Sequence, residues 1–151
     1  MKKSLILLIL VLTKIVYSQD ENKYLSIDLT EERVYSIKEV EQYPLTRNCK
    51  LKKDKEKNKK CFSISVSKYI NKKFNTNLAA ELDGKIKILV SFVITKTGEI
   101  ANVEAISEYE ILSKEAIRVV SSIPKMKPAY INNKAVNVQV KDYPIVFYIH
   151  E

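Results

Sequence analysis

Hydrophobic residues recur at every third or fourth position between residues 62 and 74, which is the spacing of one face of an α-helix. This stripe consists of Phe62, Val66, Tyr69, Ile70 and Phe74. The pattern breaks at residues 75–77, where two asparagines favour a cap or a turn. The sequence therefore predicts a first helix that ends near residue 75, with one more helical turn before Gly84.

The hydrophobic period changes to two after residue 85, and this period predicts a β-strand. Its core face consists of Ile86, Ile88, Val90, Phe92 and Ile94. Gly98 follows in a short loop, and Ala101, Val103 and Ala105 then alternate in a second strand. Because so short a loop leaves no room for a crossover, the two strands are expected to pair in antiparallel fashion.

A second amphipathic helix is predicted between residues 108 and 123. Its apolar stripe consists of Leu112, Ala116, Val119, Val120 and Ile123. Ser107 and Glu110 have the spacing of a capping box at its start. Pro124 should end the helix, since proline lacks an amide and its ring collides with the preceding turn. Glu115 and Arg118 are expected to face water.

The last hydrophobic element, residues 135–149, alternates in two phases. The first phase comprises Val136, Val138 and Val140, and the second comprises Ile145, Phe147 and Ile149. A change of phase indicates a bulge or a bend, and Pro144 beside it favours an edge strand, because a central strand would miss a hydrogen bond there. The predicted fold is α+β, with two helices packed on a small antiparallel sheet of about three strands.

Composition changes this picture at the N-terminal side of the 151-residue chain, whose net charge is +8. Residues 1–18 combine Lys2 and Lys3 with an apolar run too short to span a bilayer, which is typical of a cleaved signal peptide. No cysteine lies near the predicted cut, so no lipid attachment is expected. We expect an exported, periplasmic protein with a flexible lead-in over residues 19–40. An N-terminal segment that stays uncleaved as an anchor is the alternative.

Two cysteines, Cys49 and Cys61, lie in a lysine-rich segment that we predict to be a loop, residues 41–61. An even cysteine count in an exported chain favours a disulfide. Such a bond would close a loop of about a dozen residues and contribute roughly 3 kcal/mol to stability. The lysines are either a solvated surface or a weak contact for anionic lipid or polysaccharide.

Catalytic and cofactor chemistry has little support in the sequence. His150 is the single histidine, so hydrolytic triads lack a base, and two cysteines with one histidine cannot complete a four-ligand zinc site. We expect no enzymatic activity, no cofactor and no metal, and an exported protein meets no nucleic acid.

The predicted edge strand offers a binding function instead. A partner can add its own strand to such an edge through backbone hydrogen bonds, although Lys141 and Pro144 can equally protect the edge from aggregation. The candidate partner-binding residues are Val136, Asn137, Val138, Gln139, Val140, Lys141 and Tyr143. A proline at Gln139 is then expected to weaken partner binding, and the same edge would also allow a homodimer.

Residues 62–149 resemble the C-terminal domain of TonB. The matching positions are Phe92, Gly98, Glu115, Ala116, Arg118, Pro124, Met126, Pro128, Pro144, Ile145 and Phe147. The turn motif of the family corresponds to Pro124, Lys125, Met126, Lys127 and Pro128, and Ala129 stands where the family usually has glycine. The cysteine-containing segment before residue 62 is similar to that of short exported members, and residues 62–151 are the expected domain.

The resemblance implies a non-enzymatic periplasmic module. It would contact outer-membrane TonB-dependent transporters, or a component of the Ton system, through its last strand. The energy-transducing members carry a membrane anchor and a long proline-rich linker, which we do not expect here. Transport-related binding is therefore implied, whereas force transmission is implied only if the N-terminal segment remains as an anchor.

Overall fold

The structure is a computed structural model that describes residues 24, 28 and 32–149. The elements are β1 (Val34–Ser36), α2 (Lys55–Lys73), the 3₁₀ helix η1 (Thr76–Ala79), β2 (Gly84–Ile94), β3 (Ile100–Ile106), α3 (Glu110–Ser121), β4 (Ala129–Ile131) and β5 (Lys134–Ile149). The predicted signal peptide and most of the predicted lead-in lie outside the described residues. Within the described part of the chain, no helix is long and apolar enough to cross a membrane.

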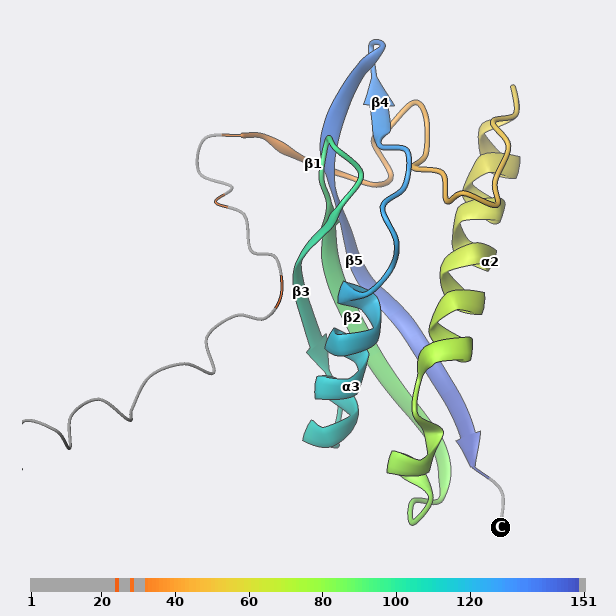
Figure 1. The fold of residues 1–151 in the computed structure, drawn as a ribbon, viewed down its shortest axis with the longest axis vertical. Helices are drawn as coiled ribbons and strands as arrows, with labels where there is room; N and C mark the ends of the chain where they lie inside the picture. Colours follow the sequence, from red (N-terminus) through yellow and green to blue (C-terminus); the bar gives the residue numbers. More distant parts are fainter. Residues whose placement is uncertain (1–23, 25–27, 29–31, 150–151) are drawn as a thin grey trace, which may run out of the picture.

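The five strands form a mixed sheet in the order β1-β5-β2-β3, with β4 paired to the first residues of β5. β1 runs parallel to β5, and the other pairs are antiparallel. Both α2 and α3 lie in front of the sheet (Figure 1). The α+β prediction is confirmed, but the predicted sheet of about three strands was too small. The two additional strands, β1 and β4, are three residues long, which is too short for a readable hydrophobic period.

The core lies between the two helices and one face of the sheet. Ile88, Val90 and Ile94 of β2 are fully buried, together with Val66 of α2 and Val119 of α3. The period-two face predicted for residues 86–94 is therefore confirmed. Burying side chains of this size stabilises the fold by about 1.5–3 kcal/mol each relative to leaving them exposed.

Helix α2 begins seven residues earlier than the sequence pattern indicated. The side chain of Asp54 accepts hydrogen bonds from the amides of Glu56 (2.9 Å) and Lys57 (3.3 Å) and so caps the helix. The predicted loop of residues 41–61 thus ends at Asp54, and its last lysines belong to the first turns of α2. Those turns contain almost no apolar residue, so the hydrophobic stripe could not reveal them.

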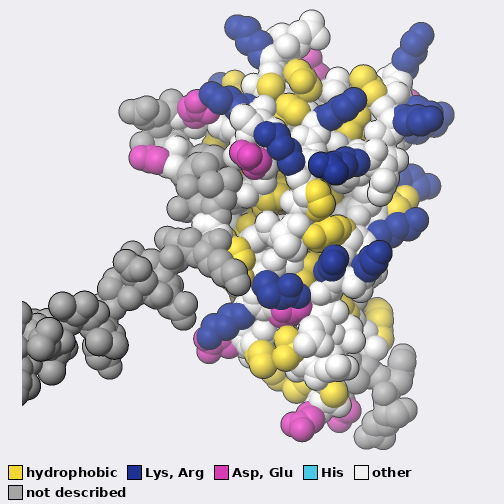
Figure 2. Space-filling view, viewed as in Figure 1, with side chains coloured by type: hydrophobic (Ala, Val, Ile, Leu, Met, Phe, Trp, Pro, Cys, Tyr) yellow, Lys and Arg dark blue, Asp and Glu magenta, His cyan; other side chains and the backbone are white. Residues whose placement is uncertain are grey.

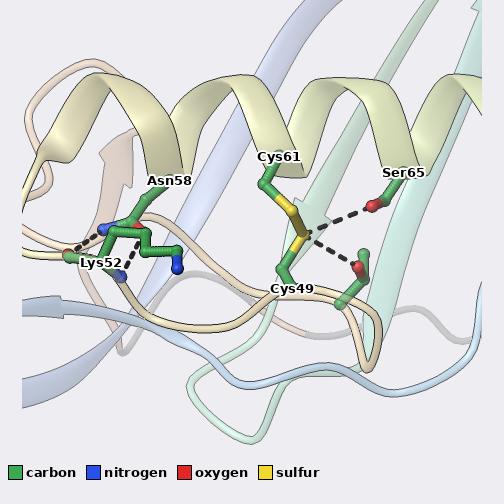
Figure 3. The surroundings of a disulfide bond; sticks show 6 residues. Cys49, Lys52, Asn58, Cys61 and Ser65 are labelled. Carbon is green, nitrogen blue, oxygen red and sulfur yellow. Dashed lines mark hydrogen bonds between the residues drawn. A yellow bond between two sulfur atoms is a disulfide. The ribbon is translucent and has the colours of Figure 1, made fainter.

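The predicted disulfide between Cys49 and Cys61 is confirmed, with 6.0 Å between the two Cα atoms (Figure 3). Beside it, the buried Asn58 of α2 accepts a hydrogen bond from the amide of Lys52 and donates one to its carbonyl, both at 2.8 Å. The segment that precedes α2 is therefore fastened to the helix by a covalent bond and by a side chain.

The predicted lead-in and the predicted capping box both differ from the structure. Val40 is fully buried and Val34–Ser36 form a strand, so the end of the lead-in belongs to the folded domain. Helix α3 begins after Tyr109 without a side-chain cap, because the hydroxyl of Ser107 accepts instead from the amide of Tyr109 (3.2 Å).

Glu115, which the sequence places on the water-facing side of α3, is buried. Its carboxylate accepts hydrogen bonds from the amide of Asn75 (2.8 Å) and from Nε and Nη2 of Arg118 (2.7 and 2.6 Å). Arg118 also donates to the carbonyl of Lys73 (3.1 Å), the last residue of α2. The hydrogen bond from Arg118 lowers the pKa of Glu115, although burial opposes this effect. This ion pair joins α3 to the end of α2.

We expect Glu115→Gln to lower the free energy of unfolding at pH 7 by about 2 kcal/mol, because hydrogen bonds to a charged group are lost. The folded-state pKa of Glu115 is depressed, so its contribution is present above the unfolded-state pKa and is lost as the pH falls through the folded-state pKa. The difference between parent and variant should therefore shrink on acidification. Urea unfolding at several pH values measures this.

Glu110→Gln is the matched control, since Glu110 forms an exposed pair with Lys114 on the same helix (2.7 Å). We expect it to change the urea midpoint little at any pH. If both variants lost the same free energy of unfolding, the buried contacts of Glu115 would stabilise the fold no more than an exposed ion pair does.

Candidate functional site

Strand β5 has neighbours on both sides along its first part. It pairs with β2 from Val138 to Ile149. On its other side, residues 134–136 pair with β4 and residues 137–139 pair with β1. The edge predicted for residues 136–139 is therefore interior to the sheet. The covering strand β1 lies about a hundred residues earlier in the chain, so no local pattern near β5 could indicate it.

Most of the predicted partner-binding residues support the domain itself. Val138 and Val140 are buried in the core, Val136 pairs with Ala129 of β4, and the carbonyl of Gln139 accepts from the amide of Ile37 (3.0 Å).

Asn137 is buried, and its side chain fastens the start of β1. Its Oδ1 accepts from the amide of Lys96 (2.7 Å), and its Nδ2 donates to Glu32 (2.8 Å). Glu32 also forms an ion pair with Lys96 (2.5 Å). The hydrogen bond from Lys96, followed by that from Asn137, lowers the pKa of Glu32. Together these contacts hold the segment that covers residues 137–139.

A bulge in β5 marks the point where this cover ends. Val140 pairs with Phe92 and Tyr143 pairs with Val90, so Lys141 and Asp142 together oppose a single residue of β2. Asp142 has a φ of 52°, and its amide donates to the hydroxyl of Ser91 (3.1 Å). The predicted change of phase is therefore confirmed as a bulge. Beyond it, β5 has no second strand neighbour among the described residues. We call residues 141–149 the open edge.

The hydrogen-bonding direction of the open edge follows from the alternation of the ladder. The amide of Thr95 donates to the carbonyl of Glu99 (2.9 Å), so odd-numbered residues of β2 point toward β3 and even-numbered residues point toward β5. Ile88 of β2 pairs with Ile145 of β5, so the main-chain groups of these two residues point toward each other.

Consequently Pro144, Val146 and Tyr148 direct their backbone groups away from β2. The missing amide of Pro144 removes no hydrogen bond from the sheet, which explains why a proline is tolerated there. The open edge presents both main-chain groups of Val146 and Tyr148.

A hollow of about 580 Å³ lies beside the open edge. Its lining is mainly apolar and includes Phe74, Ala79, Val146, Phe147 and Tyr148, together with the polar residues Asn71 and Thr76. The ring of Phe147 packs on Phe74 with 4.6 Å between centroids, whereas the side chains of Val146 and Tyr148 are 39 % and 65 % exposed. Main-chain donors and acceptors next to a mainly apolar hollow suit the addition of a strand whose side chains alternate into a pocket.

Lys141 and Tyr143 are the two predicted binding residues that lie on the open edge. Lys141 is exposed, while the phenol of Tyr143 lies 2.7 Å from the hydroxyl of Ser67 and donates to the carbonyl of Ser63 (3.2 Å). Tyr143 thus also ties β5 to α2. The sequence analysis did not name Val146 and Tyr148 as binding residues. They alternate with Pro144 along the strand, so their backbone groups point to the same side as the missing amide of Pro144.

The predicted turn motif of residues 124–128 supports the opposite end of the sheet. Met126 is buried, and its amide donates to the carbonyl of Gly98 (2.9 Å) in the β2–β3 loop. Lys127 exchanges two backbone hydrogen bonds with Leu45 (2.9 and 3.1 Å), and Lys125 pairs with Glu99 (3.6 Å). The motif holds the loop and the segment before α2, and none of its five residues lines the hollow beside the open edge.

Metal ligands do not gather within the described part of the chain, where no three His, Cys, Asp or Glu side chains come together.

Comparison with known proteins gives one family. Residues 78–149 match the family model described as Gram-negative bacterial TonB protein C-terminal. Comparisons with curated proteins and with solved structures gave no significant match. The matched region runs from η1 to β5 and contains the open edge and the turn motif, whereas β1, the disulfide and α2 precede it.

Proposed function

Residues 78–149 are a TonB C-terminal domain, and from this premise we propose that the protein binds a segment of an outer-membrane TonB-dependent transporter, or of a Ton-system component, on the open edge of β5. Domains of this family are non-enzymatic protein-interaction modules of the cell envelope that typically contact outer-membrane transporters. The observation that carries the proposal is the half of β5 that has no second strand neighbour among the described residues, with its outward amides beside a mainly apolar hollow.

The length of the open edge limits the partner segment. Residues 143–149 extend over roughly 20 Å at 3.3 Å per residue, which suits an added strand of about six residues. Affinity comes from main-chain hydrogen bonds, and selectivity from side chains that enter the hollow. A longer partner strand would have to displace β1, which is held by the contacts of Glu32 with Lys96 and Asn137.

Export with cleavage after residue 18 stays part of the proposal. It is tested by the mass of the protein isolated from its native envelope. A mass that corresponds to a chain starting at Gln19 supports a periplasmic module, whereas a mass that corresponds to a chain still carrying residues 1–18 supports an anchored mini-transducer.

An NMR titration of isotope-labelled protein with synthetic N-terminal peptides of transporters tests the binding site. We expect saturable shifts of the amides of residues 141–149 and of the facing start of β2, with residues 134–139 nearly unchanged. A matched peptide with proline at its centre should shift nothing, because its backbone cannot complete the ladder. Shifts confined to β3, or no shift with any peptide, would contradict the proposal.

A further inference from the structure

A second concave surface, which shares no lining residue with the hollow beside the open edge, lies between α2 and two other segments. The segments are residues 46–48 and residues 123–125, and the groove encloses about 760 Å³. Its apolar lining includes Ile64, Tyr69, Ile123 and Pro124. Ile64, in the middle of α2, is 43 % exposed. We call this surface the basic groove.

The charge of the basic groove has one sign. Seven of its sixteen lining residues are lysine or arginine, and none is acidic. Helix α2 contributes Lys57, Lys60, Lys68, Lys72 and Lys73, and the facing segments contribute Arg47 and Lys125. Figure 2 shows lysine and arginine side chains gathered over this part of the molecule, with hydrophobic atoms between them.

Few of these cations are neutralised by the protein itself. Lys57 lies 3.9 Å from Asp54, and Lys125 lies 3.6 Å from Glu99. The other five form no salt bridge with a residue that the structure describes. Positive charges held close together around an apolar floor repel one another, and an anionic ligand would relieve this repulsion.

The cations of α2 form a line. Lys57, Lys60, Lys68 and Lys72 follow one another at helical spacings on one face, with Ile64 at the centre of the row. At 1.5 Å per residue the row extends over roughly 22 Å. The groove therefore matches an elongated anion with apolar groups along its length.

Both walls of the groove are fixed before any ligand binds. The Cys49–Cys61 disulfide ties the segment before α2 to the helix, and Ser65 lies 3.3 Å from the sulfur of Cys49 (Figure 3). On the other wall, the phenol of Tyr69 donates to the carbonyl of Ser122 (2.6 Å). A preformed site of this kind loses little conformational entropy on binding.

We propose that the basic groove binds an acidic peptide segment that also carries apolar side chains. A peptide supplies carboxylates over the whole row together with side chains for the apolar floor. A flat bilayer surface would not reach the floor of a concave groove, a single lipid headgroup is too short for the row, and an acidic polysaccharide has no apolar side chains.

Fluorescence anisotropy with a labelled twelve-residue peptide, in which pairs of glutamate alternate with pairs of leucine, tests the inference. We expect saturable binding that weakens as salt is raised. The glutamine-leucine counterpart and a poly-glutamate of the same length should each bind at least about tenfold more weakly. Equal affinity for the peptide and poly-glutamate would show charge attraction alone and would overturn the proposal.

A triple variant, Lys60→Gln, Lys68→Gln and Lys72→Gln, should bind the peptide about tenfold more weakly, since three surface pairs at about 0.5 kcal/mol each are removed. Its charge-matched control is Lys38→Gln, Lys87→Gln and Lys134→Gln, three exposed positions outside the groove, which should stay within twofold of the parent. If both triple variants lost the same affinity for the peptide, the effect would depend on net charge alone, and specific binding in the groove would be contradicted.

A second pair of variants tests the apolar floor. Ile64→Ser should weaken binding of the glutamate-leucine peptide, whereas Ile111→Ser, which removes an isoleucine that is 52 % exposed on α3, should not. Circular dichroism checks that all variants keep the fold. Binding to phosphatidylglycerol vesicles without binding to the peptide would overturn the proposal in favour of a lipid surface. A variant impaired at the open edge should still bind the peptide, so the two sites can fail separately.

Discussion

Gly98→Ala should lower the free energy of unfolding by about 3 kcal/mol or more. Gly98 has a φ of 89°, a region in which residues with a side chain are strained by about 1–2 kcal/mol. A Cβ at this position would lie 1.7 Å from the carbonyl oxygen of Met126, which is far inside van der Waals contact. The backbone must therefore move, and the hydrogen bond from the amide of Met126 to the carbonyl of Gly98 (2.9 Å) is lost with it.

Gly84→Ala is the matched control for this prediction. Gly84 also has a positive φ, 81°, but a Cβ there would meet no atom within 4 Å. Gly84→Ala should therefore lower the free energy of unfolding only by the backbone strain, about 1–2 kcal/mol. Urea unfolding of both variants measures the two values. If Gly98→Ala destabilised the protein no more than Gly84→Ala, the contact between the β2–β3 loop and the turn of residues 124–128 would be incidental.

The contact of Gly98 with Met126 also shows what sequence reasoning could and could not supply. Glycine in a short loop between two alternating strands predicts a left-handed residue, and the structure confirms it. The partner of that glycine is distant in sequence, so its close approach could not be derived from local spacing. The resemblance to a family includes both Gly98 and Met126 among the matching positions, but it does not give the physical reason for their contact.

Elements in which the hydrophobic pattern continues over many residues were predicted well, whereas short elements and elements rich in charged residues were not. Strands β2 and β3 and the apolar stripe of α3 follow the pattern. The first turns of α2 are rich in lysine and depend on the cap from Asp54. Glu115 occupies a polar position of the helical pattern but is buried, because Arg118 and the amide of Asn75 satisfy its carboxylate.

The predicted edge strand does have an open edge in the structure, but this edge lies beyond the bulge, whereas residues 137–139 are covered by β1. Sequence parity identified the bulge, and Pro144 correctly indicated an edge. The cover over residues 137–139 comes from β1, whose three residues are held in place by side-chain contacts of Glu32 and Asn137. Such a pairing depends on tertiary contacts between distant segments, and a strand of three residues has no pattern of its own.

Val146→Pro should weaken binding of a transporter peptide by at least about thirtyfold, which corresponds to about 2 kcal/mol. The amide of Val146 points away from β2, so its removal takes a donor from the partner strand and leaves a partner carbonyl unpaired. The domain itself should stay folded, because Pro144 already occupies the same parity two positions earlier.

Val146→Ala separates the backbone effect from the side chain. It keeps the amide and removes part of a side chain that is already 39 % exposed, so binding should change only about twofold. Ile145→Pro tests the assigned parity in the opposite sense. Its amide faces β2, and we therefore expect a loss of ladder hydrogen bonding and a clear fall in the melting temperature.

Gln139→Pro distinguishes the open edge from the half that β1 covers. The carbonyl of Gln139 accepts from Ile37, and its backbone faces β1 rather than solvent. Proline there should loosen β1 and leave peptide binding on residues 141–149 close to that of the parent. The sequence alone predicted that Gln139→Pro weakens partner binding, and the pairing of Gln139 with β1 changes that expectation. A thirtyfold loss in Gln139→Pro together with normal binding by Val146→Pro would place recognition on the covered half, and β1 would then have to leave before a partner could bind.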